Sequence, residues 1–571
     1  MRLKIIRILI IIGFIVITLE LVYVQMIRGP YYYRLSTNNR IRVVPLEGYR
    51  GRIYDRNGLL LADNRVSYDV MVTPQDIEDR DELFNFLSDA LSLDSKKLHR
   101  SYLNKKFAPF APVTLVEDVD KKKAIVLEEN RFRFPSLIIH KSFKRNYPHD
   151  KSAAHVLGYV GKINRAKYER FQEYGYSQQS IIGYSGVEEY YDSYLKGEQG
   201  GVQVEVNSRG KQVRILSIKD PAQGQDITLT IDKSLQVMSE KLLGQKRGAI
   251  IMMDLDSGEI LTMASAPSYD PNVFLDKTKS KQVTALFKSK RAPLLNRTIR
   301  GAYPPGSVFK IPMALAGLDT RKITKDSLVE SKGYFDLGGI RFGCTAPPGK
   351  YNLNESLAHS CNVYYYKLGL RLGPELINEY AKRFGLGELT HIDLPHEKKG
   401  QMPSPRQRML KKRQRWYKGH TLNYSIGQGD ALTTPMQLVH MMAIVANDGK
   451  VVQPHLLRAV SGEKVEPVKY SKNLKIKKKH FESVQKGMRS AVTDYAGTAH
   501  FLDLKDLYVA GKTGTAQSSP GKEHHAWFVG FVNNDKMNFA FCIFLEHGGS
   551  SHNATLLARQ LLMEMKETKF L

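Results

Sequence analysis

The stretch Tyr303-Pro304-Pro305-Gly306-Ser307-Val308-Phe309-Lys310 is the part of the sequence that best predicts the fold. Its two prolines and glycine indicate a rigid turn, and the apolar residues 311–316 that follow indicate a buried helix. Helix positions i and i+3 share a face, so the hydroxyl of Ser307 and the amine of Lys310 should point into one space. A serine becomes a good nucleophile when a neighbouring base accepts its proton. One such pair is common on solvated helices, so its meaning depends on partners elsewhere.

Two later motifs supply these partners, namely Ser360-Cys361-Asn362 and Lys512-Thr513-Gly514-Thr515. The first lies at a predicted junction between a helix and a loop, and the second lies on a predicted strand. The order Ser-x-x-Lys, Ser-x-Asn, Lys-Thr-Gly is similar to the set that penicillin-binding proteins and β-lactamases carry. Each motif alone is weak, but the three in this order and context are specific.

The residue types of these motifs suit catalysis of acyl transfer. Ser307 would attack a carbonyl carbon and form an acyl-enzyme. Lys310 can act as a base only while neutral, and burial together with the second cation, Lys512, should lower its pKa. We expect Ser360 to relay a proton between Lys310 and the leaving amine, and Asn362 to hold Lys310 and the substrate amide.

The third motif is expected to bind the substrate. The hydroxyls of Thr513 and Thr515 suit a substrate carboxylate, which Lys512 would also attract. The backbone N–H groups of Ser307 and Thr515 are the expected oxyanion hole. Gly514 should allow the strand to approach the substrate backbone closely. His524, His525 and Trp527, which follow this motif, are candidates to line the cleft, although a tryptophan is more often a core residue.

The amino terminus is typical of a membrane anchor. Residues 8–26 are almost entirely apolar, with Glu20 near the far end, and their length suits one tilted span. A cleaved signal peptide is the competing interpretation, but no small-x-small cleavage site follows. The cations on the short side, which are Arg2, Lys4 and Arg7, predict a cytoplasmic amino terminus and an exported remainder.

The segments after residue 220 predict an α+β domain. A strand hairpin at 248–264 begins it, three strand patterns at 508–517, 526–533 and 537–545 end it, and a helix at 554–566 follows. Strands at both ends around a helical middle suggest one sheet that joins them. The predicted domains are residues 1–27 (cytoplasmic tip and anchor), 28–220 (non-catalytic interaction domain) and 221–571 (catalytic domain).

Composition narrows the class of protein further. With 571 residues, 42% of them hydrophobic, the chain should form two or three globular domains. Its formal charge of +28 suits nucleic acid or an anionic membrane surface or wall polymer as a partner. No zinc-finger, helix-turn-helix or RNP-type signature is present, so we expect a solvated basic surface and no nucleic-acid partner.

The three cysteines predict neither a disulfide framework nor a cofactor site. Cys542 lies in an apolar strand pattern, where a buried structural thiol is expected. Cys344, His359 and Cys361 together suggest a zinc site, but they match no ligand set, so we expect buried cysteines and a solvated histidine there.

The chain resembles the class B penicillin-binding proteins over nearly its whole length. Arg50-Gly51-x-Ile53-x-Asp55-Arg56-x-Gly58 is similar to the family's pedestal signature, and residues 55–58 should form a hairpin turn. Further segments favour the elongation type, penicillin-binding protein 2, over the division type: residues 154–161, 186–191, 204–210 and 416–429. Asn362 departs from this subtype, in which many members have aspartate at that position.

This resemblance implies a transmembrane helix, an elongated mixed pedestal, and a transpeptidase domain with a five-stranded antiparallel sheet and helices on both faces. It implies D,D-transpeptidation, in which the terminal D-Ala-D-Ala of one peptidoglycan stem peptide is cleaved and its acyl group passes to an amine of another. It also implies inhibition by β-lactams, a catalytic domain in the periplasm or other extracytoplasmic space, and no cofactor. The implied partner is a RodA-type glycosyltransferase of the shape, elongation, division and sporulation (SEDS) family, contacted through the anchor and pedestal.

Five other functions remain open from the sequence. A division-type transpeptidase and a D,D-carboxypeptidase share all three motifs. A β-lactamase shares them too, but it lacks the pedestal and anchor. A penicillin sensor or a non-catalytic scaffold of a wall-synthesis complex belongs to a different class, and the intact motifs argue against a pure scaffold.

Overall fold

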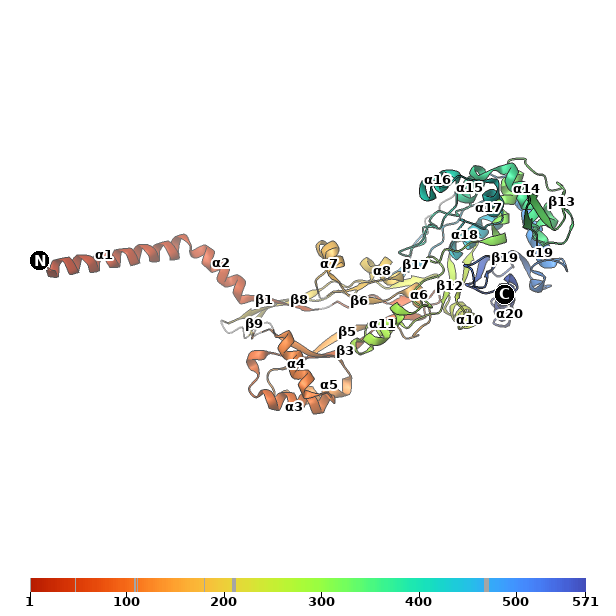
Figure 1. The fold of residues 1–571 in the computed structure, drawn as a ribbon. Coiled ribbons are helices and arrows are strands. Elements are labelled where there is room, and N and C mark those ends of the chain that lie inside the picture. The colour runs from red at the N-terminus through yellow and green to blue at the C-terminus, as the bar shows by residue number, and fades with distance from the viewer. Residues whose placement is uncertain are drawn as a thin grey trace. The chain divides into compact units, whose positions relative to one another are not determined.

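The computed structural model describes residues 2–46, 48–106, 109, 111–178, 180–207, 212–466 and 472–571. The chain forms two compact units, each assembled from segments that are separated in the sequence (Figure 1). The first unit comprises Met1–Gly51, Asn64–Lys144 and Lys196–Gly224. The second comprises Arg52–Asp63, Arg145–Leu195 and Gln225–Leu571.

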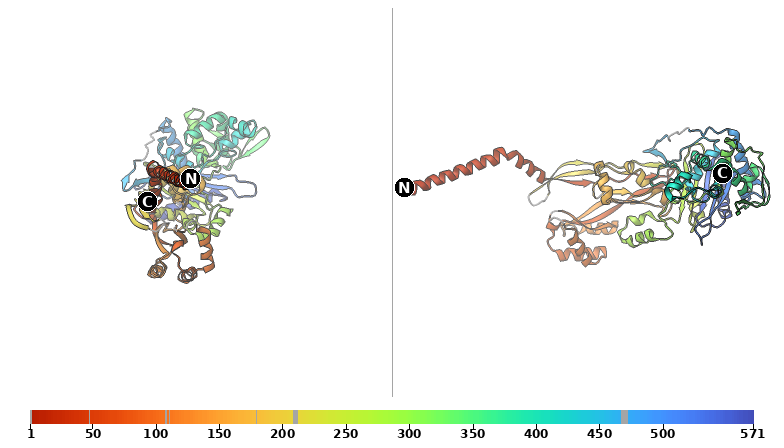
Figure 2. Two further views of the ribbon diagram at one scale, coloured as in Figure 1. Left: turned by 90° about the vertical axis from the view of Figure 1, so that its left-hand side faces the viewer. Right: turned by 45° about the horizontal axis from the view of Figure 1, so that its top comes forward.

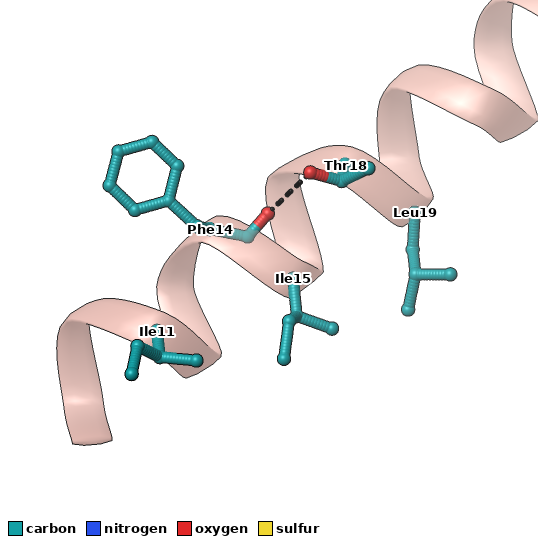
Figure 3. Close-up of a pocket in the computed structure, with 5 residues that line it drawn as sticks. All are labelled: Ile11, Phe14, Ile15, Thr18 and Leu19. Carbon is teal, nitrogen blue, oxygen red and sulfur yellow. Dashed lines mark hydrogen bonds between the residues drawn. The ribbon is translucent and has the colours of Figure 1, made fainter.

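The first unit begins with a long exposed helix. Helix α1 (Arg2–Val22) continues through a π-helical turn (Tyr23–Ile27) towards α2 (Gly29–Arg40), and α1 is drawn in red at the amino terminus in Figure 2. The apolar stretch Leu3–Ile27 has 25 residues, and an 18-residue window within it has a mean hydropathy of 2.8, which suffices by length and composition to cross a membrane. Figure 3 shows that the hydroxyl of Thr18 donates to the Phe14 carbonyl at 2.8 Å, so this polar group is satisfied within the helix, as lipid requires.

The remainder of the first unit is a mixture of short helices and strands. Strands β1 (Ile41–Leu46), β8 (Gly200–Val206) and β9 (Gln212–Lys219) form an antiparallel sheet. Three helices pack with β4 (Val113–Val119) and parts of β3 (Leu60–Val72) and β5 (Leu137–Asn146): α3 (Arg80–Leu91), α4 (Ser95–Lys105) and α5 (Lys121–Glu129). Each helix begins after an aspartate whose carboxylate accepts backbone N–H groups: Asp79, Asp94 and Asp120. Arg209 and Gly210, which belong to the predicted signature at 204–210, lie outside the described residues.

The second unit contains the predicted five-stranded antiparallel sheet, which confirms the α+β fold. The strands, in the order in which they pair, are β12 (Ile260–Ala266), β11 (Gly248–Asp254), β21 (Phe539–Leu545), β20 (His525–Asn533) and β19 (Tyr508–Ala516). Strands from both ends of residues 225–571 therefore meet in one sheet, as the sequence pattern predicts. Because β19 lies at the sheet edge, one side of its backbone remains available for other contacts.

Both faces of this sheet are buried. Side chains alternate along a strand, so Trp527 and Val529 of β20 belong to one core while Phe528 and Val532 belong to the other. Helices α10 (Lys233–Leu243) and α20 (Ser551–Glu567) cover the second face, and α18 (Pro435–Ala446) covers the first. Because both faces are buried, the sequences of these strands are almost uninterrupted apolar runs.

A helical region lies between the sheet strands in the sequence. It opens with the short 3₁₀ turn η6 (Gly306–Phe309), and its helices are α12 (Lys310–Asp319), α13 (Leu353–Ala358), α14 (Asn362–Leu372), α15 (Pro374–Arg383), α16 (Pro405–Lys412), α17 (Lys418–Ser425) and α19 (Lys478–Thr493). Four short strands form two pairs, which are β13 (Val329–Ser331) with β16 (Gly349–Tyr351) and β14 (Tyr334–Leu337) with β15 (Ile340–Gly343). Most residues of α12 and α14 are buried, so the groups that they carry are held rigidly.

Smaller elements complete the second unit. Strands β2 (Ile53–Tyr54), β10 (Ile227–Leu229), β17 (Leu457–Val460) and β18 (Glu463–Lys464) pair in the order β18-β17-β10-β2. The pair of β6 (Val160–Lys162) and β7 (Ile181–Gly183) stands apart from them. The short helices are α6 (Ala154–Leu157), α7 (Arg165–Phe171), α8 (Gly186–Tyr190), α9 (Asp192–Leu195) and α11 (Ser280–Lys288).

The hairpin turn predicted at residues 55–58 is confirmed, since it joins β2 to β3. The buried carboxylate of Asp55 accepts the N–H groups of Asn57 at 2.8 Å and Leu59 at 2.7 Å. Its second oxygen accepts the N–H of Lys233, at the start of α10, at 3.2 Å. Arg56 also pairs with Glu259 at 2.9 Å. The signature-like hairpin is thus held within the second unit by its bonds to α10 and to Glu259.

A buried ion pair holds another part of the same unit. Arg145 Nε donates to Glu188 at 2.6 Å, and the two side chains are 1% and 0% exposed. The hydroxyl of Tyr147 donates to the same carboxylate oxygen at 3.2 Å. A buried charge without its partner is strongly destabilising, so each member of this pair depends on the other.

We therefore expect Glu188→Ala to lower the free energy of unfolding by about 3–5 kcal/mol, because it removes the carboxylate that the buried Arg145 Nε contacts at 2.6 Å. Chemical denaturation followed by tryptophan fluorescence measures this loss. The matched control is Glu169→Ala, which removes an exposed pair with Arg165 (side chains 61% and 91% exposed) and should cost about 0.5 kcal/mol or less. Equal losses in the two variants would contradict the role of the buried pair.

Candidate active site

Ser307 and Lys310 lie at the junction of η6 and α12. Ser307 is within the 3₁₀ turn and Lys310 is the first residue of α12. A 3₁₀ helix has three residues per turn, so residues 307 and 310 lie on the same face of it. Lys310 is completely buried, whereas Ser307 is partly exposed. Within the described part of the chain, the Ser307 hydroxyl has no hydrogen-bond partner. The hydroxyl is thus accessible, and the amine lies beneath the surface.

The turn that carries Ser307 packs closely against the edge strand β19. A Cβ atom at Gly306, where φ is +56°, would lie 2.8 Å from the Thr515 carbonyl oxygen, and one at Gly514 would lie 2.9 Å from the Pro305 oxygen. Only glycine permits both approaches. Trp527 Nε1 also donates to the Pro304 carbonyl at 3.0 Å. Gly514 therefore accommodates the turn, and its predicted approach to a substrate stays a prediction.

The structure brings the first two motifs together at the amine of Lys310. Nζ donates to the Ser360 carbonyl at 2.7 Å, to the Ser360 hydroxyl at 3.1 Å and to Asn362 Oδ1 at 2.7 Å. Ser360 has a left-handed backbone (φ +58°), and both its carbonyl and its hydroxyl oxygen contact the same nitrogen. Three oxygen acceptors match the three donors of an ammonium group.

Burial lowers the pKa of Lys310 to about 7, while negative charge on Cys344 and Cys361 acts in the opposite direction. The pKa of Lys512 is also lowered well below its usual range, first by complete burial and then by the charge of Lys310. The prediction that burial lowers the pKa of Lys310 is thus confirmed. The repulsion between the two lysines, however, lowers the pKa of Lys512 and not that of Lys310. A substrate carboxylate beside Lys512 would raise the pKa of Lys512 again.

The third motif lies on β19, where the strand passes the turn. Lys512 is buried and its Nζ donates to the Thr513 carbonyl at 3.3 Å. Thr513 is buried, whereas Thr515 is exposed and its hydroxyl oxygen accepts the N–H of Ser551 at 3.2 Å. Thr515 also borders a shallow hollow of about 320 Å³, lined besides by Lys522, Glu523, His524, Gly549 and Ser550. A Cβ atom at Gly306 would lie 3.4 Å from the Thr515 nitrogen, so the two predicted oxyanion donors belong to adjacent backbone segments.

The sequence patterns missed the contacts that three residues make at the site. Gln428 binds the outer edge of β19, since its Nε2 donates to the Thr515 carbonyl at 3.3 Å and its Oε1 accepts the N–H of Gln517 at 3.3 Å. The ring of Tyr365 lies 5.4 Å from Lys310 Nζ, within the range of a cation–π contact. Cys344 Sγ accepts the N–H of Asn362 at 3.1 Å. In the sequence, the glycines on both sides of Gln428, within the segment 416–429, could have predicted a tight turn at this residue.

The suggested zinc ligands do not converge. Cys344 and Cys361 have their Sγ atoms 3.6 Å apart, but His359 contacts Asp494 at 3.4 Å and the Ala496 carbonyl at 3.2 Å. Among the residues that the structure describes, no group of three or more His, Cys, Asp or Glu side chains is arranged to hold a metal ion.

The other residues singled out near the third motif are placed as follows. Trp527 is a core residue, His524 is exposed, and His525 is buried between Tyr303 and His547, with ring centroids at 5.1 Å and 4.8 Å. Burial lowers the pKa of His525 to about 4, so this histidine is neutral at physiological pH. Cys542 is buried in β21 with a raised pKa, as expected of a structural thiol.

Comparison with known proteins identifies two matching families. Residues 248–563 match the family "Penicillin binding protein transpeptidase domain", and residues 45–229 match "Penicillin-binding Protein dimerisation domain". The first match contains all three motifs. The chain is also 34% identical over 572 residues to the "Peptidoglycan D,D-transpeptidase MrdA" of Acinetobacter baumannii, covering 96% of this chain and 85% of that protein.

Solved structures give the same result. A complex between the penicillin-binding protein PBP2 and MreC from Helicobacter pylori superimposes with a TM-score of 0.82 at 28% identity, covering 93% of this chain and 99% of that chain. A structure described as "Structural coordination of polymerization and crosslinking by a peptidoglycan synthase complex" superimposes with a TM-score of 0.74 at 29% identity, covering 98% and 97%. Sequence, fold and the order of the three motifs agree, and the chain belongs to the class B penicillin-binding proteins, in the group of penicillin-binding protein 2 (MrdA).

Proposed function

We propose that this chain is a serine-type peptidoglycan D,D-transpeptidase of the elongation type, with Ser307 as nucleophile and Lys310 as its base. The observation that carries the proposal is the buried amine of Lys310, held by Ser360 and Asn362 directly after the turn of Ser307. A pKa of about 7 leaves a large neutral fraction at physiological pH. Membership of the family supports peptidoglycan stem peptides as substrates and β-lactams as inhibitors.

Acylation begins with proton transfer from Ser307. A neutral amine has two N–H donors and one lone pair, so Lys310 can accept the Ser307 proton while it still donates to the Ser360 carbonyl and to Asn362. In this state the Ser360 hydroxyl is free to donate, and it can pass a proton onward to the departing D-alanine amine. The N–H groups of Ser307 and Thr515 stabilise the oxyanion, at about 3 kcal/mol per donor.

The edge strand β19 carries the residues that bind the substrate. Lys512 attracts the terminal carboxylate of the stem peptide, and Thr513 and Thr515 offer it hydroxyls. The backbone of β19 beside Gly514 is the segment that we expect the substrate backbone to approach. The acyl group then passes to an amine of a second stem peptide, and water at the same position would give D,D-carboxypeptidase activity instead.

The amino-terminal helix supports a membrane-bound arrangement. The cations Arg2, Lys4 and Arg7 precede the apolar stretch, which favours an amino terminus in the cytoplasm and a catalytic unit in the periplasm or other extracytoplasmic space. The relative described as a peptidoglycan synthase complex favours a glycosyltransferase partner. We assign this role to a RodA-type enzyme of the SEDS family, contacted through the anchor (1–27) and the pedestal (28–220), with residues 221–571 as the catalytic domain.

The nucleophile is tested by labelling with a fluorescent penicillin. Wild type should carry one covalent adduct, which mass spectrometry places on Ser307, and Ser307→Ala and Lys310→Ala should each lose at least about 10³-fold in acylation rate. Ser483→Ala, which removes a hydroxyl bonded within α19, is the matched control and should label normally. An adduct on another residue, or normal labelling of either site variant, would refute the mechanism.

The base is tested by the pH dependence of acylation. Because only neutral Lys310 accepts a proton, the rate should fall about tenfold per pH unit below a pKa of about 7 and level off above it. Asn362→Asp places a carboxylate where Oδ1 now lies 2.7 Å from Nζ, which favours the charged amine and should move the curve to higher pH. Stopped-flow acylation of both proteins measures this shift. A rate independent of pH between 5.5 and 9 would contradict the role of Lys310.

The partner is tested with the full chain co-purified with a RodA-type glycosyltransferase. Lipid II polymerisation and cross-linking are measured in one assay. Ser307→Ala should abolish cross-links and leave polymerisation unchanged, whereas removal of residues 1–27 should lower polymerisation and leave penicillin labelling intact. Loss of polymerisation in Ser307→Ala, or full polymerisation without the anchor, would reject this division of roles.

A further inference from the structure

Two cysteines lie together beside the proposed catalytic base. Cys344 follows strand β15, Cys361 is the residue before α14, and their Sγ atoms are 3.6 Å apart although 17 positions separate them in the chain. We propose that Cys344 and Cys361 form a disulfide bond in the exported protein, which fastens the Ser360-x-Asn362 motif to the β14–β15 hairpin. The inference rests on the proposed extracytoplasmic location of this unit, because disulfides persist in oxidising compartments.

The backbone holds both residues in place for this bond. The N–H of Cys344 donates to the Gly333 carbonyl at 2.9 Å, and the N–H of Cys361 donates to the Ser356 carbonyl at 3.0 Å. A disulfide has an S–S distance of about 2.05 Å, so the two sulfur atoms need to approach by only about 1.5 Å. Cys542, the third cysteine, lies within strand β21 of the sheet and is fully buried.

The two thiols differ in a way that suits stepwise oxidation. Cys344 is partly exposed and Cys361 is buried, so an oxidant reaches Cys344 first. The Cys361 thiol and the N–H groups of Val363, Ala346 and Asn362 lower the pKa of Cys344 to about 5, whereas the pKa of Cys361 is raised. A thiolate is the reactive form of cysteine, so Cys344 is the attacking group and Cys361 the resolving one.

The oxidant is the disulfide of an exported thiol–disulfide oxidoreductase. The Cys344 thiolate attacks one sulfur of that disulfide, which forms a mixed disulfide and releases the other sulfur as a thiolate. Cys361 then loses its proton and attacks Cys344 Sγ, which forms the intramolecular bond and releases the second thiolate. The two cysteines lose two electrons and two protons in total, and the oxidoreductase gains them as two thiols.

This bond would change the electrostatic surroundings of Lys310. The groups that face its amine from the neighbouring elements are Ser360, Asn362, Tyr365, Lys512, Cys344 and Cys361. Negative charge on the cysteines favours the protonated amine, and a disulfide carries no charge. The oxidised protein should thus have a larger neutral fraction of Lys310, and a faster acylation, at acidic pH.

The bond itself is tested on the full chain, exported and extracted in detergent, then alkylated with iodoacetamide without reductant and digested. We expect one linked pair of peptides that contains Cys344 and Cys361, two hydrogens lighter than the separate thiols and released by dithiothreitol. Cys542 should be alkylated after denaturation, as an internal control. Full alkylation of Cys344 and Cys361, even after incubation with glutathione disulfide, would overturn the proposal, as would co-purification of one zinc ion with both thiols reduced.

The effect on the base is tested by comparing acylation before and after reduction. Reduction should move the pH profile of wild type to higher pH, and each rise of the Lys310 pKa by one lowers the rate about tenfold on the acidic side. Cys344→Ala should show no change on reduction, and Cys542→Ala should behave as wild type. An identical profile for oxidised and reduced wild type would overturn the coupling. Penicillin adducts at Ser307, scored in the same digests, separate a failure of this proposal from a failure of the acylation mechanism.

Discussion

The hydrogen bonds of one buried amine organise the whole site. Lys310 reaches no water, and its nitrogen is satisfied by two oxygens of Ser360 and one of Asn362. A buried charge without such partners would cost several kcal/mol. The start of helix α12, the bend at Ser360 and the start of α14 therefore stabilise one another. The same burial lowers the pKa of the amine into the physiological range. Stability and reactivity at this position therefore have one physical cause.

Much of this arrangement follows from local patterns in the sequence. The strands at both ends of the second unit were predicted because apolar residues that face two cores form runs without interruption, as in Phe539–Leu545. The residues around Lys310 were predicted because their motifs have a specific order. The contacts of Gln428 with Thr515 and of Cys344 with Asn362 were missed because they join positions 87 and 18 residues apart, and no local period reports such pairs.

The pKa shifts of the two lysines depend on how deeply the fold buries each amine. From the sequence, Lys512 is the cation that lowers the pKa of Lys310, since two positive charges repel. In the fold both amines are buried, and burial is the larger effect at each. The charge that the site presents to a substrate thus depends on depth below the surface, which residue identity alone does not encode.

The hairpin Arg52–Asp63 determines where a soluble fragment of this chain should begin. Strand β2 pairs in parallel with β10 through Ile53 and Ile227, and Asp55 bonds to the first residue of α10. Residues far towards the amino terminus thus form part of the second unit, which contains the three motifs. A soluble fragment cut at residue 221 would expose the edge of β10 and leave the N–H of Lys233 without its carboxylate. Fragments intended for crystallisation or inhibitor screening should begin before Arg52.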